Sequence, residues 1–161
     1  MNRSLVFLIM TAAAGTLAPF GARAEAPINL ALFNPIQITK ETEAVSALRF
    51  SLIYGANTNV SGLDISLVGV DKGSGSGLSW HGVGVREGDY AGFDVGLASI
   101  NRGTFTGVQV GAINTAGSFS GLQVGLLNIA DTMTSGVQIG LVNIIKNKEK
   151  LKFLPVVNWK F

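Results

Sequence analysis

Six glycines recur along the chain at an almost fixed interval, and this regularity constrains the fold more than any other feature. They open six similar units at Gly62, Gly77, Gly92, Gly107, Gly121 and Gly136, and only the step from Gly107 to Gly121 is shorter than the others, by a single position. A period of this length is typical of repeat architectures, in which each unit packs mainly against its neighbours. We therefore expect one regular, repeat-built structure rather than several independent domains.

Each unit opens with the pattern of a β-strand. Residues 122–126, for example, read Leu-Gln-Val-Gly-Leu, so that aliphatic side chains alternate with polar or small ones. Such alternation is typical of a strand with one apolar face. The units then continue into turn-forming segments such as residues 101–104, Asn-Arg-Gly-Thr. Residues 48–54 and 153–161 alternate in the same way, and the sequence predicts an all-β protein.

Two all-β architectures can be built from such a unit. The main prediction is an up-and-down antiparallel meander that closes into a small barrel of about eight strands. In a meander, a change of parity between successive apolar rows requires an even loop and an unchanged parity requires an odd one. The loops assigned to the repeats satisfy this rule, including the short loop at residues 115–117. The alternative is a β-solenoid with one coil of about 15 residues per unit, which also tolerates a deletion in a turn.

The two architectures place the polar side chains on different faces. In the barrel, the apolar rows form the exterior, as in outer-membrane β-structure, and Asp64, Asp94, Gly and Gln line a narrow, filled interior. In the solenoid, the apolar rows face inward and Gln109, Gln123 and Gln138 stack as an outward ladder. The barrel predicts a structural or surface-interaction protein in the outer membrane, and the solenoid predicts a secreted or surface-attached binding or adhesion module.

The N-terminal segment, residues 1–24, has the features of an export signal. Residues 1–4 are short and basic, residues 5–18 form an apolar run of secretory length, and residues 22–24, Ala-Arg-Ala, form a small-x-small cleavage site. Cleavage there leaves a single β domain of residues 25–161. We expect an exported protein in the outer membrane or, for the solenoid, at the cell surface or outside the cell.

The charge balance argues against a nucleic-acid partner. The chain has 12 Lys and Arg against 10 Asp and Glu, but two of the arginines lie in the signal segment, so the mature net charge is zero. Basic residues cluster only at Lys146, Lys148, Lys150 and Lys152. In the barrel reading their loop is extracellular, and these lysines are expected to contact lipopolysaccharide phosphates or another anion. A solvated charged turn is the other interpretation.

The C-terminal segment carries a separate pattern. Val157, Trp159 and Phe161 alternate, and the chain ends on an aromatic residue. This pattern resembles the terminal strand of bacterial outer-membrane β-barrels, which implies outer-membrane lipid as a partner and recognition of Trp159 and Phe161 by the barrel assembly machinery. Pro155 departs from the pattern, because it removes one hydrogen bond from the strand ladder.

The most regular units share the pattern G-[LV]-Q-[VI]-G-x-x-N over residues 107–114, 121–128 and 136–143. These units resemble a family of uncharacterised bacterial surface-repeat proteins. The earlier units are degenerate, with Asp or Ser in place of Gln. The resemblance implies export and surface exposure, and it supplies no catalytic residue.

Residues suited to common enzymatic chemistry are scarce. The chain has no cysteine and a single histidine, His81, so neither a multi-ligand metal site nor a Ser-His-Asp set with a nucleophile elbow is indicated. We expect His81 to be structural, and Asp64 and Asp94 to face Arg49 or glutamines rather than to form an acid–base pair. Glycine-rich stretches lack the Lys-Ser/Thr of a phosphate loop. The sequence therefore predicts a non-enzymatic protein without a cofactor or metal.

Overall fold

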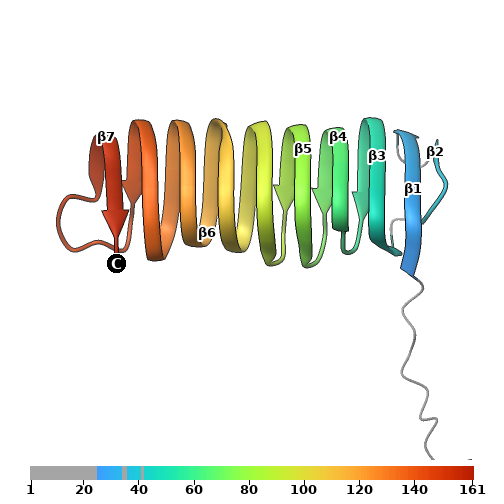
Figure 1. The fold of residues 1–161 in the computed structure, drawn as a ribbon, viewed down its shortest axis with the longest axis horizontal. Helices are drawn as coiled ribbons and strands as arrows, with labels where there is room; N and C mark the ends of the chain where they lie inside the picture. Colours follow the sequence, from blue (N-terminus) through green and yellow to red (C-terminus); the bar gives the residue numbers. More distant parts are fainter. Residues whose placement is uncertain (1–24, 34–35, 41) are drawn as a thin grey trace, which may run out of the picture.

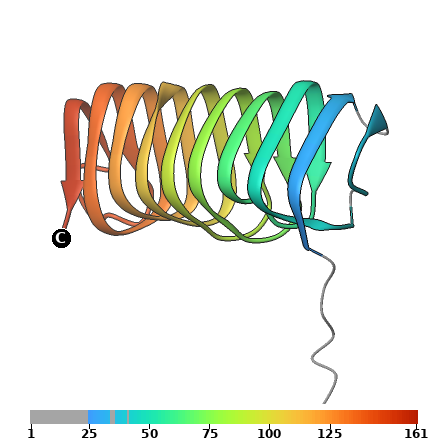
Figure 2. The same cartoon turned by 45° about the vertical axis from the view of Figure 1, so that its right-hand side comes forward.

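The protein is a β-solenoid, a chain wound as successive coils around one axis (Figures 1 and 2). The structure, a computed structural model, describes residues 25–33, 36–40 and 42–161. The export signal expected over residues 1–24 lies outside the described residues. Within the described ranges, no helix has the length and hydropathy needed to cross a membrane.

In the part of the chain that the structure describes, seven strands form a single sheet that follows the coils. In chain order they are β1 (Glu25–Phe33), β2 (Ile36–Gln37), β3 (Ala44–Asn57), β4 (Ser61–Asp71), β5 (Gly75–Arg86), β6 (Tyr90–Ile145) and β7 (Phe153–Lys160). The order in the sheet is β2-β1-β3-β4-β5-β6-β7. The pairings from β1 through β3, β4 and β5 to β6 are parallel, whereas β2 and β7 pair antiparallel at the two ends. β6 winds through several coils without a break (Figure 1).

The antiparallel meander and the barrel are therefore wrong, and the alternative architecture is the one observed. Gly62 pairs with Gly77 and Gly77 pairs with Gly92, so equivalent residues of successive units lie side by side in parallel register. In a solenoid each coil advances by one full period, and every residue stacks on its equivalent whatever the parity of the loop. Loops of odd and even length are therefore equally compatible with the solenoid, and the parity of the loops does not distinguish it from a meander.

The recurring glycines form a column at one corner of the solenoid. All six have positive φ, between 100° and 157°. A Cβ atom added to Gly121 would lie 1.9 Å from the carbonyl oxygen of Gly107, and one added to Gly77 would lie 2.1 Å from that of Gly62. Both the backbone conformation and the close approach of the next coil exclude a side chain. This corner sets the period that is visible in the sequence.

Three corners divide each coil into three sides. In the coil that starts at Gly107, one corner is the positive-φ glycine itself, and the other two are residues 112–113 and 117–118, where two consecutive residues face outward. We call residues 108–112 and their equivalents the first apolar side, and residues 113–116 and their equivalents the second apolar side. The third side, which includes residues 104–106 and 118–120, presents mostly Ser and Thr outward, and we call it the hydroxyl side.

The apolar rows face outward and the amides face inward, which corrects the arrangement expected for a solenoid. Gln109, Gln123 and Gln138 are fully buried, while Leu97 and Leu141 are exposed. The solenoid thus has the distribution of residues that was expected of the barrel, with apolar side chains outside and amides and carboxylates inside. Its apolar core is small and lies behind the hydroxyl side, where the ring of Phe105 stacks between Tyr90 and Phe119 at centroid distances of 5.5 and 5.9 Å.

Replacing a corner glycine tests the steric basis of the period. Gly121→Ala should lower the free energy of unfolding by about 3 kcal/mol, because a Cβ atom there meets backbone and the positive φ is strained. The neighbouring Ser120→Ala removes an outward hydroxyl and should change it by less than about 0.5 kcal/mol. Urea unfolding followed by circular dichroism measures both. Equal stabilities of the two variants would contradict the steric account.

Candidate functional site

The interior of the N-terminal coils holds a cluster of charged and polar side chains. We define the ionic cluster as Arg49, Asp64, Asp71, Ser79, His81, Arg86, Asp94 and Ser99, all of which are buried. The parallel register creates the cluster, because Arg49, Asp64, Ser79 and Asp94 stack in one column. In later coils the same column continues as glutamine.

Two arginines and three aspartates form a chain of ion pairs inside the cluster. Arg49 donates to Asp64 (Nε to Oδ1, 2.8 Å) and pairs with Asp71 (Nη1 to Oδ1, 2.7 Å). Arg86 pairs with Asp71 (Nε to Oδ2, 3.2 Å) and donates to Asp94 (Nη1 to Oδ2, 2.9 Å). The prediction that Asp64 faces Arg49 is confirmed. Asp94 instead pairs with Arg86, and Asp71, which was not predicted from the sequence, bridges the two arginines.

Burial and charge act in opposite directions on these groups. Burial alone lowers the pKa of Arg49, but the carboxylates of Asp71 and Asp64 outweigh it and raise that pKa. Burial likewise opposes the charge on Arg86, whose pKa is raised by Asp94 and Asp71. For Asp71, burial raises the pKa, and the two arginines offset this only in part. Both guanidinium groups are therefore held firmly in the charged state.

His81 links two serines and an aspartate. Its Nδ1 lies 3.2 Å from Oδ1 of Asp94 and 3.2 Å from Oγ of Ser79, and its Nε2 lies 3.2 Å from Oγ of Ser99. The order Ser99–His81–Asp94 is that of a hydrolytic triad. However, Ser99 and Asp94 are fully buried, so no substrate reaches the hydroxyl in this conformation. Burial also lowers the pKa of His81, although Asp94 raises it in part, which favours a neutral imidazole in a structural network.

Ser99 was not predicted from the sequence, although the period of the chain contains a signal for it. Ser99 stacks on Gly84 in the register between β5 and β6. A Cβ atom on Gly84 would lie 2.4 Å from Nε2 of His81, so the absence of a side chain there leaves room for the imidazole ring. In an alignment of the repeat units, Ser99 occupies the position equivalent to Gly84, one coil later and next to the imidazole ring.

The carboxylates of the cluster are occupied by arginine and histidine rather than free to bind a cation. Across residues 25–33, 36–40 and 42–161, no group of three or more His, Cys, Asp or Glu side chains is placed to hold a metal ion. The described cluster is thus an internal electrostatic network, and what the molecule presents to a partner must lie on its surface.

Two amide ladders replace the ionic cluster in the C-terminal coils. Nε2 of Gln123 donates to Gln109 and Nε2 of Gln138 donates to Gln123, both at 2.8 Å. The second ladder contains Asn114, Asn128 and Asn143, whose amides bond one another at 2.8 Å. The polar stations that define the repeats therefore supply internal hydrogen bonds and not an outward binding face.

The four lysines named from the sequence do not form one patch of free cations. Nζ of Lys146 pairs with Asp131 at 2.6 Å, and Nζ of Lys148 donates to Oδ1 of Asn158 (2.8 Å) and to the carbonyl oxygen of Trp159 (3.0 Å). Lys148 therefore ties the segment that connects β6 to β7 against β7 itself. Lys150 and Lys152 are exposed in the segment that connects β6 to β7.

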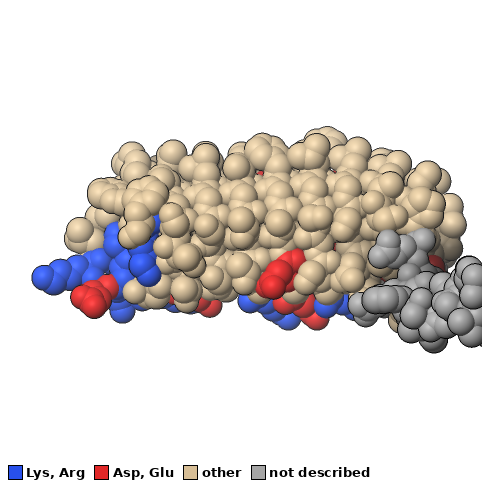
Figure 3. Space-filling model, turned by 60° about the horizontal axis from the view of Figure 1, so that its bottom comes forward, with Lys and Arg blue, Asp and Glu red and all other residues tan. Residues whose placement is uncertain are grey.

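The exterior is apolar over the first and second apolar sides. Large exposed side chains there include Leu67, Trp80, Leu97, Ile113 and Leu141. Figure 3 shows charged side chains gathered along one edge of the molecule and at its C-terminal end, and uncharged surface over the rest of the visible face. Among the exposed charges, Arg102 pairs with Glu87 at 3.6 Å and Lys146 pairs with Asp131. This continuous apolar surface is the candidate functional site, because monomeric soluble proteins rarely expose one of such extent.

Removing one arginine from the ionic cluster tests its role in stability. Arg49→Met should lower the free energy of unfolding by about 3–5 kcal/mol, because it leaves buried carboxylates without their counter-ion. Arg102→Met breaks the exposed 3.6 Å pair with Glu87 and should cost less than about 0.5 kcal/mol. Denaturant unfolding of both variants measures the difference, and an Arg49→Met protein as stable as Arg102→Met would refute the assignment.

The single histidine gives a pH-dependent test. In the folded protein the pKa of His81 lies below its ordinary value of 6.5, so the unfolded chain takes up a proton first as pH falls. The free energy of unfolding contributed by His81 should therefore decrease from about pH 7.5 toward pH 5.5. Urea unfolding across this range should show a steeper decline for the native protein than for His81→Gln. An imidazole NMR signal that titrates at or above 6.5 would contradict this expectation.

The comparisons with known proteins give no family for this chain. No protein-family model, curated protein or solved structure matches it. The resemblance of the G-[LV]-Q-[VI]-G-x-x-N units to bacterial surface-repeat proteins therefore stays a prediction.

Proposed function

We propose that the protein is an exported, non-enzymatic β-solenoid that attaches to a lipid surface through its two apolar sides. The observation that carries the proposal is the outward orientation of the aliphatic rows in every coil of the repeat. Leaving such a surface in water costs about 25 cal/mol for each square ångström. A lipid surface removes it from water, while the hydroxyl side and the charged edge remain hydrated.

The backbone of a solenoid is suited to an apolar environment. N–H and C=O groups of each coil bond to the coils before and after it, so unpaired ladder positions are confined to the two ends of the stack. At the C-terminal end, β7 covers the last coil in antiparallel register. These two ends, together with the polar hydroxyl side, favour attachment in the interface of a bilayer over insertion across it.

The charged groups support the same orientation. The exposed Lys150 and Lys152 lie at the C-terminal end, beside apolar residues that include Leu151 and Phe153. Cations next to an apolar surface are suited to the phosphates of phospholipids or lipopolysaccharide. For an exported protein of a diderm bacterium, the outer membrane is the surface that combines these partners. Recognition of Trp159 and Phe161 by the barrel assembly machinery is no longer motivated, because β7 closes a coil and not a barrel.

Vesicle flotation tests the proposal. The native protein should float with vesicles of phosphatidylethanolamine and phosphatidylglycerol, whereas Leu126→Glu/Leu141→Glu should weaken binding at least about tenfold, because two apolar contacts become charged. Vesicles without phosphatidylglycerol should bind less protein, because the contact with Lys150 and Lys152 is lost.

The matched control places the same charges on the hydroxyl side. Thr104→Glu/Thr106→Glu should bind vesicles like the native protein, since these residues are outward but on the polar side. The lipid assignment would be refuted if the native protein stayed at the bottom of the gradient while the vesicles floated. Equal loss of vesicle binding in both variants would refute it as well. Loss of a dimer in the leucine variant alone would assign the apolar sides to a second copy instead.

A further inference from the structure

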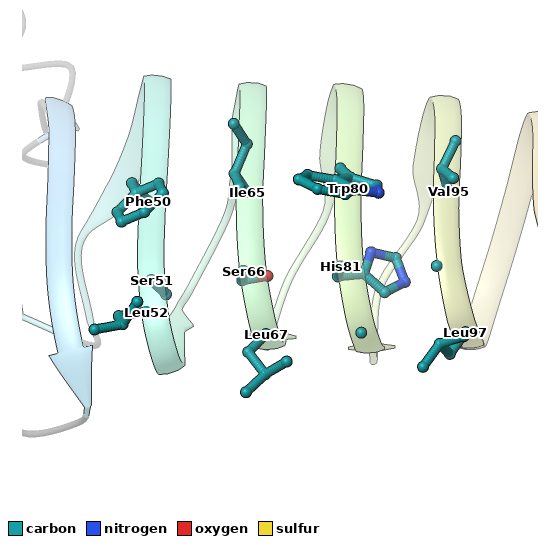
Figure 4. Close-up of a pocket in the computed structure, with 12 residues that line it drawn as sticks. Phe50, Ser51, Leu52, Ile65, Ser66, Leu67, Trp80, His81, Val95 and Leu97 are labelled. Atoms are coloured by element: carbon teal, nitrogen blue, oxygen red, sulfur yellow. The ribbon is translucent and has the colours of Figure 1, made fainter.

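The first apolar side carries a straight groove over its N-terminal coils. Its volume is about 520 Å³, within the range of small-molecule sites. Figure 4 shows the two rows of side chains that wall it, which cross β3, β4, β5 and the start of β6. The first row is Phe50, Ile65, Trp80 and Val95, and the second row is Leu52, Leu67, Gly82 and Leu97.

The rows leave a long and narrow space. Residues two apart on a strand stand about 7 Å from one another, which sets the distance between the rows, and four adjacent strands span about 14 Å. Carbon atoms in contact lie about 4 Å apart. The groove therefore has room for a single file of carbon atoms with a wall on each side, and it is too narrow for a folded peptide element.

The groove occurs at these coils because their side chains are large. Phe50 and Trp80 raise the first row, and Leu67 and Leu97 raise the second row, while Gly82 between them leaves an opening. In the next coil, Val110 and Ala112 occupy the corresponding positions and provide lower walls. The groove therefore ends where these smaller side chains begin, and Leu126 and Leu141 lie beyond them on the same side.

The groove is mainly apolar. Ser51, Ser66 and His81 lie between the two rows, but their side chains are buried on the inner face of the sheet. His81, for example, bonds inward to Ser99. The walls consist of aliphatic and aromatic side chains without a charged group. A ligand held there is recognised by shape and hydrophobicity alone.

We propose that this groove binds one unbranched acyl chain of an amphiphile, with the polar headgroup left outside in water. This rests on the proposed attachment to lipid, of which it names the molecular contact. A linear hydrocarbon matches the width, the length and the apolar walls together. A sugar, nucleotide or peptide would leave its polar groups without partners in the groove.

Fluorescence quenching by a brominated single-chain fatty acid tests the proposal without a bilayer. The chain has two tryptophans, so Trp159→Phe leaves Trp80, in the wall of the groove, as the only reporter. The fatty acid, added below its micelle concentration, should quench Trp80 saturably with one equivalent bound. In this background, Leu67→Ala/Leu97→Ala should weaken binding about tenfold or more, since the second wall is removed.

The solenoid offers a closely matched control in the same column of side chains. Leu126 and Leu141 are 57% and 67% exposed, against 57% and 69% for Leu67 and Leu97. Leu126→Ala/Leu141→Ala should leave quenching of Trp80 unchanged and reduce vesicle flotation as much as the groove variant does. Unsaturable quenching, or equal quenching in both variants, would overturn the acyl-chain site even where vesicles still bind. Saturable quenching without vesicle flotation would support the acyl-chain site and refute the proposed attachment to a lipid surface.

Discussion

The close stacking of one glycine on the next at a single corner is the constraint on which the rest of this structure depends. Gly107 and Gly121 approach so closely that the added Cβ atom of one would overlap the carbonyl of the other. With positive φ at each station, the chain turns sharply and returns above its starting point one period later. Because the coils are in register at this corner, equivalent side chains of successive coils also stack in columns elsewhere.

Alignment in columns explains how the solenoid tolerates a polar interior. A buried amide or charge is costly unless it is bonded, and stacking identical or complementary residues supplies the partner from the next coil. Gln123 thus accepts a hydrogen bond from Gln138 and donates one to Gln109. Asp71 likewise pairs with both Arg49 and Arg86. The ionic cluster and the amide ladders are two chemical solutions to one geometric demand.

The repeats, the strands and the separation of polar from apolar faces were predictable from the sequence, because these features follow from local periodicity. Whether the strands run parallel or antiparallel was not, since both arrangements place Leu122 and Val124 on one face. Nor was it predictable which face is inside. A Gln ladder is reasonable on either side of a sheet, because two-residue alternation separates the two faces without indicating which one the coil encloses. Contacts across the interior were predictable only between residues at equivalent positions of successive units. Arg49 and Asp64 are such a pair. Arg86 and Tyr90, whose cation–π distance is 4.1 Å, do not occupy equivalent positions, so the repeat does not predict their contact.

The polar interior and the apolar exterior are consequences of one another. On the two apolar sides, the hydrogen-bonded columns of amides and charges occupy the interior, so the aliphatic residues that alternate with them along each strand point outward. In water this arrangement forgoes most of the hydrophobic stabilisation that an ordinary core provides. A surface that covers the two apolar sides would return that stabilisation, and the fold would then be most stable in the place where its function is carried out.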